Sequence, residues 1–286
     1  MELRIEAFDA AGVKVIVKRE DLNHPFVSGN KWWKLRKNLE FARAQNHSTV
    51  LTFGGAYSNH IYSAAAATKE IGLKSIGIVR GEETLPLNST LAFATSQGMQ
   101  LKYISRELYR NKESDDFIKS LHEQFGSFYL IPEGGTNELA VRSCEEFAKE
   151  KLSTIDFDYL CLPVGTGGTM AGIIAGLGGD KEIVGVSVLK NGVFLTEAIS
   201  NLLQKIYSTT YGNWRVLTSY DHGGYAKVTR SLINFIDEMK VMHDLPLDEV
   251  YTGKLLWAVA EEARAGGFRR GSTVLVVHTG GLQGKA

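Results

Sequence analysis

The 286-residue sequence has only two cysteines, Cys144 and Cys161, and they form no closely spaced pair. Their scarcity argues against a disulfide framework and against a structural zinc site, and it predicts a reducing, cytoplasmic location. A net charge is absent too, because 32 lysines and arginines balance 32 aspartates and glutamates. Without a basic field or a basic run, we expect no nucleic-acid partner and no membrane-surface patch, and therefore a small ligand.

Long hydrophobic runs are also scarce. The one long uncharged stretch, residues 159–179, contains Pro163 and seven glycines, which would break a helix exposed to lipid. We therefore interpret it as a strand, a loop and a helix. The first residues lack the basic, apolar and small-residue order of a signal peptide, so we expect no export and no membrane partner.

Short β-rich runs alternate with helical stretches along the chain. Strands are predicted at 49–53, 75–79, 101–104, 128–131, 159–164, 183–189 and 274–278, and a long helix at 138–152. Strands separated by crossover helices favour parallel sheets covered on both faces. We expect two open α/β lobes with mostly parallel sheets and a ligand cleft between them. Residues 1–41 and 143–286 would form the large domain, and residues 42–142 the small one.

A glycine-rich turn follows the buried strand at 159–164 and opens an apolar helix. It consists of Gly165, Thr166, Gly167, Gly168 and Thr169. Free backbone N–H groups and the positive helix end would bind an anion there. The turn lacks the Gly-Lys-Ser/Thr ending of an NTP-binding loop, and Met170 stands where the dinucleotide fingerprint needs its last glycine. It favours a phosphate monoester over ATP or NAD, although a turn needed only for tight packing fits the same pattern.

Lys31 lies in the first turn of a predicted helix, for which Asn30 is the predicted N-cap and whose apolar face includes Trp32, Leu35 and Leu39. A cation in this turn opposes the helix dipole by about 0.3–1 kcal/mol, and partial burial would lower the pKa of the amine further. Both effects make the lysine a better nucleophile. The alternative is that Lys31 belongs to a solvated basic face of the helix.

Three polar residues, Ser58, Asn59 and His60, follow a second glycine turn after the strand at 49–53. Such side chains can orient a planar ligand. The alternatives are that Ser58 or Asn59 is only a helix N-cap and that His60 is a hydrogen-bonded structural residue.

Thr279 ends the last predicted strand, at the sheet edge where ligands bind in open α/β folds. Tyr225 and Tyr251 stand beside two further glycine turns. We expect the two tyrosines to form walls of the site, although a tyrosine at such a turn can simply pack its ring.

These segments, in this order, resemble the pyridoxal-phosphate enzymes of the tryptophan synthase β-subunit fold. They resemble most closely the family of 1-aminocyclopropane-1-carboxylate deaminase and D-cysteine desulfhydrase. The likeness extends from about residue 18 to residue 281. It implies a two-lobed α/β enzyme with pyridoxal 5'-phosphate in the cleft, acting on a small amino acid to release ammonia and a 2-oxo acid.

The resemblance also implies roles toward the cofactor. Lys31 would carry it as a Schiff base and later move protons. Asn59 would hydrogen-bond the ring hydroxyl, Thr279 would lie near the ring nitrogen, and Gly165 to Thr169 would hold the phosphate.

Toward the substrate, the resemblance implies that Ser58 and His60 grip the carboxylate and that Tyr225 and Tyr251 lie near the reacting group. Thr252 stands where the cyclopropane deaminases have a glutamate facing the ring nitrogen, and His60 stands where they have glutamine. A hydroxyl cannot hold that nitrogen protonated as a carboxylate does, so both differences favour β-elimination from D-cysteine over ring opening.

Three alternatives remain open. The first is a 1-aminocyclopropane-1-carboxylate deaminase proper, and the second, of another class, is a cofactor-binding protein with little turnover. The third is a nucleotide-binding protein that uses only the turn at 165–169. We also expect a homodimer, since homodimers are the commonest oligomers.

Overall fold

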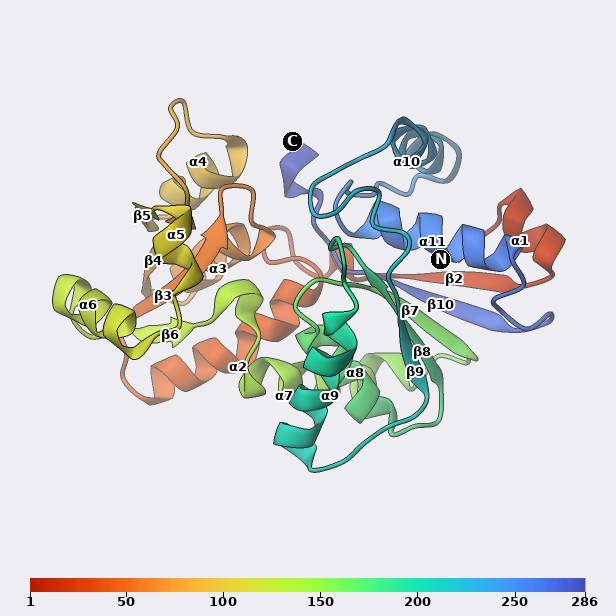
Figure 1. Ribbon diagram of the computed structural model, residues 1–286, viewed down its shortest axis with the longest axis horizontal. Coiled ribbons are helices and arrows are strands. Elements are labelled where there is room, and N and C mark those ends of the chain that lie inside the picture. The colour runs from red at the N-terminus through yellow and green to blue at the C-terminus, as the bar shows by residue number, and fades with distance from the viewer. Residues whose placement is uncertain (286) are drawn as a thin grey trace.

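Two β-sheets with helices around each of them form the fold (Figure 1). The computed structural model describes residues 1–285. The larger sheet contains, in spatial order, β1 (Glu2–Leu3), β2 (Lys14–Arg19), β10 (Thr273–His278), β7 (Tyr159–Val164), β8 (Glu182–Ser187) and β9 (Trp214–Leu217). The smaller sheet contains β5 (Gln100–Ile104), β4 (Lys74–Arg80), β3 (Thr49–Gly55) and β6 (Tyr129–Ile131). Every neighbouring pair is parallel except β1 with β2. The predicted fold class is therefore confirmed.

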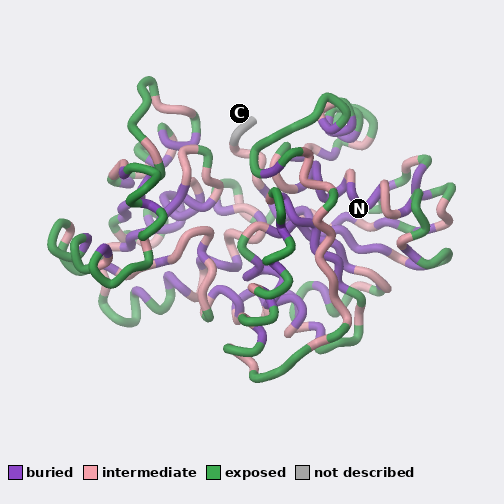
Figure 2. Tube along the Cα trace, viewed as in Figure 1, coloured by how far each residue is buried: buried purple, intermediate pink, exposed green. Residues whose placement is uncertain are grey.

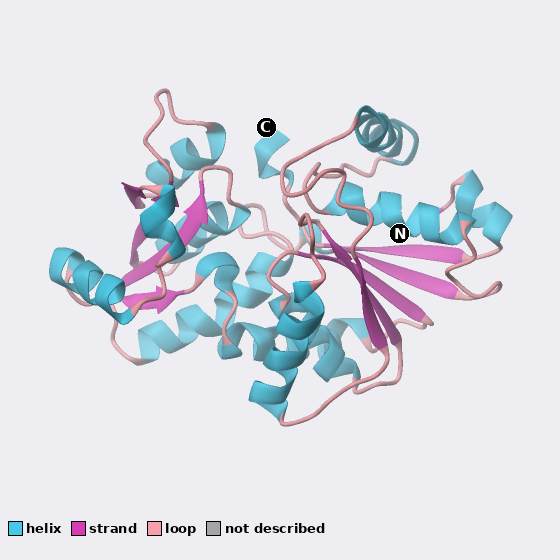
Figure 3. Ribbon diagram, viewed as in Figure 1, coloured by secondary structure: helices cyan, strands magenta, loops and turns pink. Residues whose placement is uncertain are grey.

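Helices cover both faces of each sheet (Figure 3). On the larger sheet, one face packs against α1 (Glu6–Ala11), α10 (Arg230–His243) and α11 (Thr252–Arg264), and the other against α7 (Glu138–Phe147), α8 (Gly168–Leu177) and α9 (Phe194–Tyr207). On the smaller sheet, one face packs against α2 (Asn30–Ala44), α3 (Asn59–Glu70) and α4 (Ser89–Ser96), and the other against α5 (Arg106–Arg110) and α6 (Asp115–Phe125). Short helical turns lie at Glu20–Leu22, Glu133–Gly135, Ala148–Leu152 and Leu282–Lys285.

Strand β7 illustrates why the central strands are apolar along their whole length. Leu160 and Leu162 pack in the core beneath α7 to α9, whereas Cys161 packs in the core on the opposite face. All three are fully buried, and Figure 2 shows the inner strands as the buried centre of the molecule. Each fully buried large aliphatic side chain stabilises the fold by roughly 1.5–3 kcal/mol relative to exposure. A strand buried on both faces cannot alternate apolar with polar residues.

Each strand predicted from the sequence is present, with ends that differ by a few residues. The uncharged stretch 159–179 folds as β7, a turn and α8, and none of the described helices is long and apolar enough to cross a membrane. The helix predicted at 138–152 is α7 followed by one π-helical turn. Strands β1, β2 and β9 were not predicted.

The two sheets are bridged by α2 and α7, which lie side by side below them in Figure 1. The boundaries predicted near residues 42 and 142 both fall within these helices. The division into residues 1–41 with 143–286 and residues 42–142 stays a prediction.

Candidate active site

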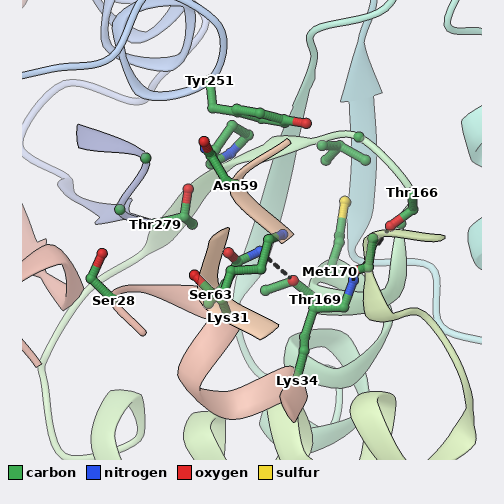
Figure 4. A pocket seen from close by; sticks show the side chains of 18 of the residues that line it. Ser28, Lys31, Lys34, Asn59, Ser63, Thr166, Thr169, Met170, Tyr251 and Thr279 are labelled. Carbon is green, nitrogen blue, oxygen red and sulfur yellow. Dashed lines mark hydrogen bonds between the residues drawn. The ribbon is translucent and has the colours of Figure 1, made fainter. Parts of the chain in front are cut away.

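A cavity lies between the two sheets, at the carboxyl ends of β3, β7 and β10, and the space free of protein atoms within it and at its open mouth is about 640 Å³. Parallel strands end at the same edge of a sheet, which brings the turns that follow them together. Of the predicted site residues, the following line the cavity: Lys31, Asn59, Gly165, Thr166, Gly167, Thr169, Tyr251 and Thr279 (Figure 4). Four predicted residues do not line it: Ser58, His60, Gly168 and Tyr225.

The turn from β7 to α8 leaves the start of the helix open. Its N-cap is Gly167, with φ of 80°, and no side chain caps the helix. A glycine is required at Gly168 as well, because a Cβ there would stand 2.7 Å from the Thr136 side chain. The first N–H groups of α8 and the positive end of its dipole thus meet at the cavity wall, which is the arrangement that binds a phosphate.

Lys31 lies in the first turn of α2 and lines the cavity. Burial lowers the pKa of its amine to about 8, so a substantial fraction is unprotonated and nucleophilic near neutral pH. The predicted N-cap was wrong: the cap position is Gly29, with φ of 67°. A Cβ on Gly29 would overlap the Thr279 carbonyl oxygen, so glycine allows α2 to start directly against the end of β10. Asn30 instead donates its side-chain N–H to Thr169 Oγ1 at 2.9 Å.

Lys34 is a second amine at the cavity, one helical turn from Lys31, which the sequence reasoning missed. It is 2% exposed, and its Nζ donates to the Gly134 carbonyl, to Thr136 Oγ1 at 2.7 Å and to Thr166 Oγ1 at 3.4 Å. Burial lowers its pKa to about 7, with a further contribution from the charge of Lys31. Its i+3 spacing from Lys31, which places both on one helix face, was the available signal.

The start of α3 differs from the start of α8. Ser58 is the N-cap, and its Oγ accepts hydrogen bonds from the backbone N–H groups of His60 at 3.2 Å and Ile61 at 3.3 Å. Ser58 therefore satisfies donors of its own helix, as one of the alternatives anticipated. Asn59, the first residue of α3, lines the cavity.

His60 faces the smaller sheet. It is 2% exposed, and its Nε2 lies 2.8 Å from Thr52 Oγ1. Because that hydroxyl donates to the Ile131 carbonyl, His60 Nε2 donates to the hydroxyl. Burial and the charges of Lys31 and Lys34 hold the pKa of His60 well below its usual value, so its ring is neutral.

Tyr251 precedes α11 and lines the cavity, and the ring of Tyr225 stands 6.1 Å from it at an angle of 75°. The carboxylate of Asp248 accepts the backbone N–H of Tyr251 at 2.8 Å and thereby fixes the approach to the helix. Burial raises the pKa of both tyrosines, so both hydroxyls stay protonated.

Thr252 does not occupy the position expected from the sequence. It is 1% exposed and absent from the cavity wall, and its hydroxyl donates to Asp248 Oδ1 at 2.7 Å. Thr279, directly after β10, does line the cavity. The side chain at 252 completes the cap of α11.

Taken together, the cavity suits a phosphate ester that carries an aldehyde. One wall offers an uncapped helix start, a lysine of lowered pKa lines the same cavity, and hydroxyl and amide groups are provided by Thr279 and Asn59. No aspartate or glutamate is among the residues that line this cavity in the described part of the chain.

The comparisons with known proteins agree with this chemistry. The model of the family described as "Pyridoxal-phosphate dependent enzyme" matches residues 3–280. The chain belongs to this family. Its cofactor is pyridoxal 5'-phosphate, and the resemblance described above is confirmed at the level of the family.

Relatives of this pyridoxal-phosphate enzyme carry two activities in their names. A "Putative 1-aminocyclopropane-1-carboxylate deaminase" of Pyrococcus abyssi is 31% identical, over 96% of this chain and 86% of the relative. A "Bifunctional D-cysteine desulfhydrase/1-aminocyclopropane-1-carboxylate deaminase, mitochondrial" of Arabidopsis thaliana is 29% identical, over 96% and 73%. A solved structure of an "ACC deaminase homologue" superimposes with a TM-score of 0.84 at 27% identity, covering 98% of this chain and 88% of that one.

Proposed function

We propose that this enzyme releases ammonia and a 2-oxo acid from a small amino acid, by β-elimination from D-cysteine or a close analogue. The observation that carries the proposal is the single cavity that joins Lys31, Asn59 and Thr279 to the open turn at 165–169. The relatives named for D-cysteine desulfhydrase and for the cyclopropane deaminase support the choice of reaction class.

Within this proposal, each residue acts on a defined part of the cofactor. When bound, pyridoxal phosphate supplies an electron sink for the bonds at the substrate α-carbon. Residues 165–169 would hold the phosphate, and Asn59 and Thr279 would orient the ring through its hydroxyl and its nitrogen. Lys31 would be the point of covalent attachment, and its freed amine would take the α-proton as the β-substituent leaves.

The substrate side of the proposal is sharpened by the position of His60. We propose that the substrate carboxylate binds at the start of α3, to Ser58 and Asn59. The ring of His60 does not contact the substrate in this proposal, because it faces Thr52. Tyr251, together with Tyr225, stands near the leaving group, where its protonated hydroxyl can donate a proton.

The choice of elimination over ring opening rests on the charge of the cavity wall. Two lysines and no carboxylate line it among the described residues. A ring nitrogen without a carboxylate partner is protonated less, which favours loss of a β-substituent. The cyclopropane deaminase remains the second candidate because a 31% identical relative carries that name.

The test combines attachment and turnover. Purified protein is mixed with pyridoxal phosphate, reduced with borohydride and mapped by mass spectrometry, with Lys31→Ala as control. We expect an adduct on Lys31, and a rate of attachment that rises with pH through about 8, since the unprotonated amine attacks. We expect turnover to fall by about 1000-fold or more in Lys31→Ala.

A panel of D- and L-amino acids with the cyclopropane substrate is then assayed for ammonia and 2-oxo acid. Rapid turnover of D-cysteine supports the proposal, and exclusive turnover of the cyclopropane substrate replaces it with the deaminase. An adduct on Lys31 without turnover of any substrate would show a cofactor-binding protein instead.

We also propose a homodimer in the cytoplasm. Both cysteines are free and buried, as suits a reducing compartment. Sedimentation equilibrium measures the assembly, and a monomer at all concentrations would contradict it.

A further inference from the structure

Lys254 is a fully buried lysine outside the cavity. It lies in the first turn of α11, three residues after Tyr251, and its side chain is 0% exposed. An ammonium group is costly to remove from water unless hydrogen-bond partners replace the water. The hydrogen-bond partners of Lys254 Nζ must therefore replace the water that the ammonium group has lost.

Both hydrogen-bond acceptors of Lys254 come from one loop. Nζ donates to the carbonyl oxygens of Asp221 and Gly224, each at 2.7 Å. The next residue after Gly224 is Tyr225. The side chain thus fixes the backbone immediately before Tyr225.

The loop that Lys254 holds has no regular secondary structure of its own. It lies between β9 and α10, and φ is positive at His222, Gly223, Gly224 and Ala226. Positive φ is unfavourable for side chains other than glycine, so such a run persists only where contacts hold it. Its internal bonds run from Gly224 N–H to the Asp221 carbonyl at 3.0 Å, from Lys227 N–H to the Gly224 carbonyl at 3.1 Å and from Gly223 N–H to the Asp221 carboxylate at 2.8 Å.

Lys254 also shares a rigid element with the other tyrosine. Tyr251 and Lys254 are separated by less than one helical turn, and Asp248 anchors that turn through the backbone N–H of Tyr251 and Thr252. One end of α11 therefore carries Tyr251 directly and holds the Tyr225 loop through the Lys254 ammonium.

We propose that Lys254 is a positioning residue whose buried ammonium clamps the loop 221–227 and sets Tyr225 against Tyr251 beside the cavity. The role of Tyr225 toward the substrate rests on the proposed function; the clamp on the loop does not. Lys254 acts through Tyr225 and touches neither cofactor nor substrate.

The test uses the holoenzyme and Lys254→Met, which keeps the unbranched side chain up to the terminal ammonium group and removes its donors. Lys227→Met is the matched control, because it makes the same change on the exposed side of the same loop. Hydrogen exchange of the peptide 218–229 is measured by mass spectrometry. We expect exchange to rise by about tenfold in Lys254→Met and to be unchanged in Lys227→Met. Unchanged exchange in Lys254→Met overturns the clamp.

A double-mutant cycle with Tyr225→Phe separates positioning from a general loss of stability. We expect Lys254→Met to lower kcat/KM by up to about 100-fold in the wild-type background, and by less than about twofold with Tyr225→Phe. The absorbance of the bound cofactor should stay unchanged. If the kcat/KM losses of the two single variants multiply in the double variant, Lys254 does not act through Tyr225.

Two results call for a further variant or a different measurement. If Lys254→Met does not fold, Lys254→Gln replaces it, because a neutral amide tolerates burial but reaches at most one of the two carbonyls. If no amino acid is turned over by the wild-type enzyme, the proposed function fails, and the exchange measurement alone decides the clamp.

Discussion

Two strand-to-helix turns in this enzyme are alike in sequence, but the helices that follow them are capped differently. Both the β3–α3 turn and the β7–α8 turn follow a buried parallel strand and lead into a helix at the cavity, and each has adjacent glycines in it or at its edge. In the first, Ser58 caps the helix with its own hydroxyl. In the second, Gly167 leaves the helix without a side-chain cap.

We infer that the difference decides which turn binds the cofactor phosphate. In a capped helix, some of the first backbone N–H groups already donate to the side chain of the N-cap residue. In an uncapped helix, these groups are free to donate to a ligand. Lys34 adds its charge on the uncapped side, through its contact with Thr166. We therefore expect changes at the β7–α8 turn to affect the cofactor, and changes at the β3–α3 turn to affect the fold and the substrate.

Among changes at the two turns, the largest effect is expected at Lys34, beside the open turn. Lys34→Met removes an amine that favours a nearby phosphate when it is protonated, and a hydrogen bond to a charged group contributes roughly 1.5–3 kcal/mol. The affinity for pyridoxal phosphate should fall by about 10- to 100-fold, measured by equilibrium titration of the cofactor absorbance.

Lys37→Met is the control for this change. Lys37 lies one turn further along α2 and pairs with Glu146 at 2.7 Å. Its loss should leave cofactor affinity within about twofold, since Lys37 does not line the cavity and ion pairs at the protein surface contribute little. Equal losses in the two variants would mean that Lys34 acts through the helix and not through the phosphate.

A smaller effect is expected from partly closing the open turn. Gly167→Asn places a side chain where φ is 80° and where a Cβ would stand 2.8 Å from Ile199. The turn must shift, and the affinity for pyridoxal phosphate should fall by about tenfold.

Gly178→Asn tests the same substitution at the other end of α8. Gly178 also has positive φ, 63°, but a Cβ on this residue would have no neighbouring atom within 4 Å. Asparagine tolerates this backbone conformation, so cofactor affinity should not change. If Gly167→Asn binds the cofactor as the wild type does, the open turn is not the phosphate site.

The smallest effect is expected at the capped turn. Ser58→Ala removes a side-chain cap and should lower the free energy of unfolding by about 1 kcal/mol, measured by urea denaturation. Ser114→Ala, which uncaps α6, should cost a similar amount, and no residue of α6 lines the cavity. Only Ser58→Ala should also raise KM, and a matching rise in Ser114→Ala would remove Ser58 from the substrate site.

The turns could be predicted from the sequence because local chemistry determines them. The pattern of an apolar strand, adjacent glycines and an apolar helix predicted both the parallel sheets and the sheet edge at which the cavity lies. Strand β2 was missed because its pairing with β10 joins residues far apart in the chain, which no local pattern reveals.

Other features depend on tertiary contacts in the same way. Asn30 has the chemistry of an N-cap, yet the approach of β10 moves the cap to Gly29. The hydroxyl of Thr252 is turned inward by Asp248, four residues earlier, and the ring of His60 is turned by Thr52. Residue types predicted which groups would gather at the cavity, but not which way each would face.

The contact of Gly29 with Thr279 has a consequence for biosynthesis. Strand β2, near the start of the chain, pairs along its whole length with β10, near the end, and α2 begins directly against the residue after β10. The surroundings of Lys31 therefore cannot assemble on the ribosome until the last strand has emerged. Contacts between such distant residues slow folding, so we expect the smaller sheet, whose strands all lie within residues 49–131, to form before the surroundings of Lys31, which require β10.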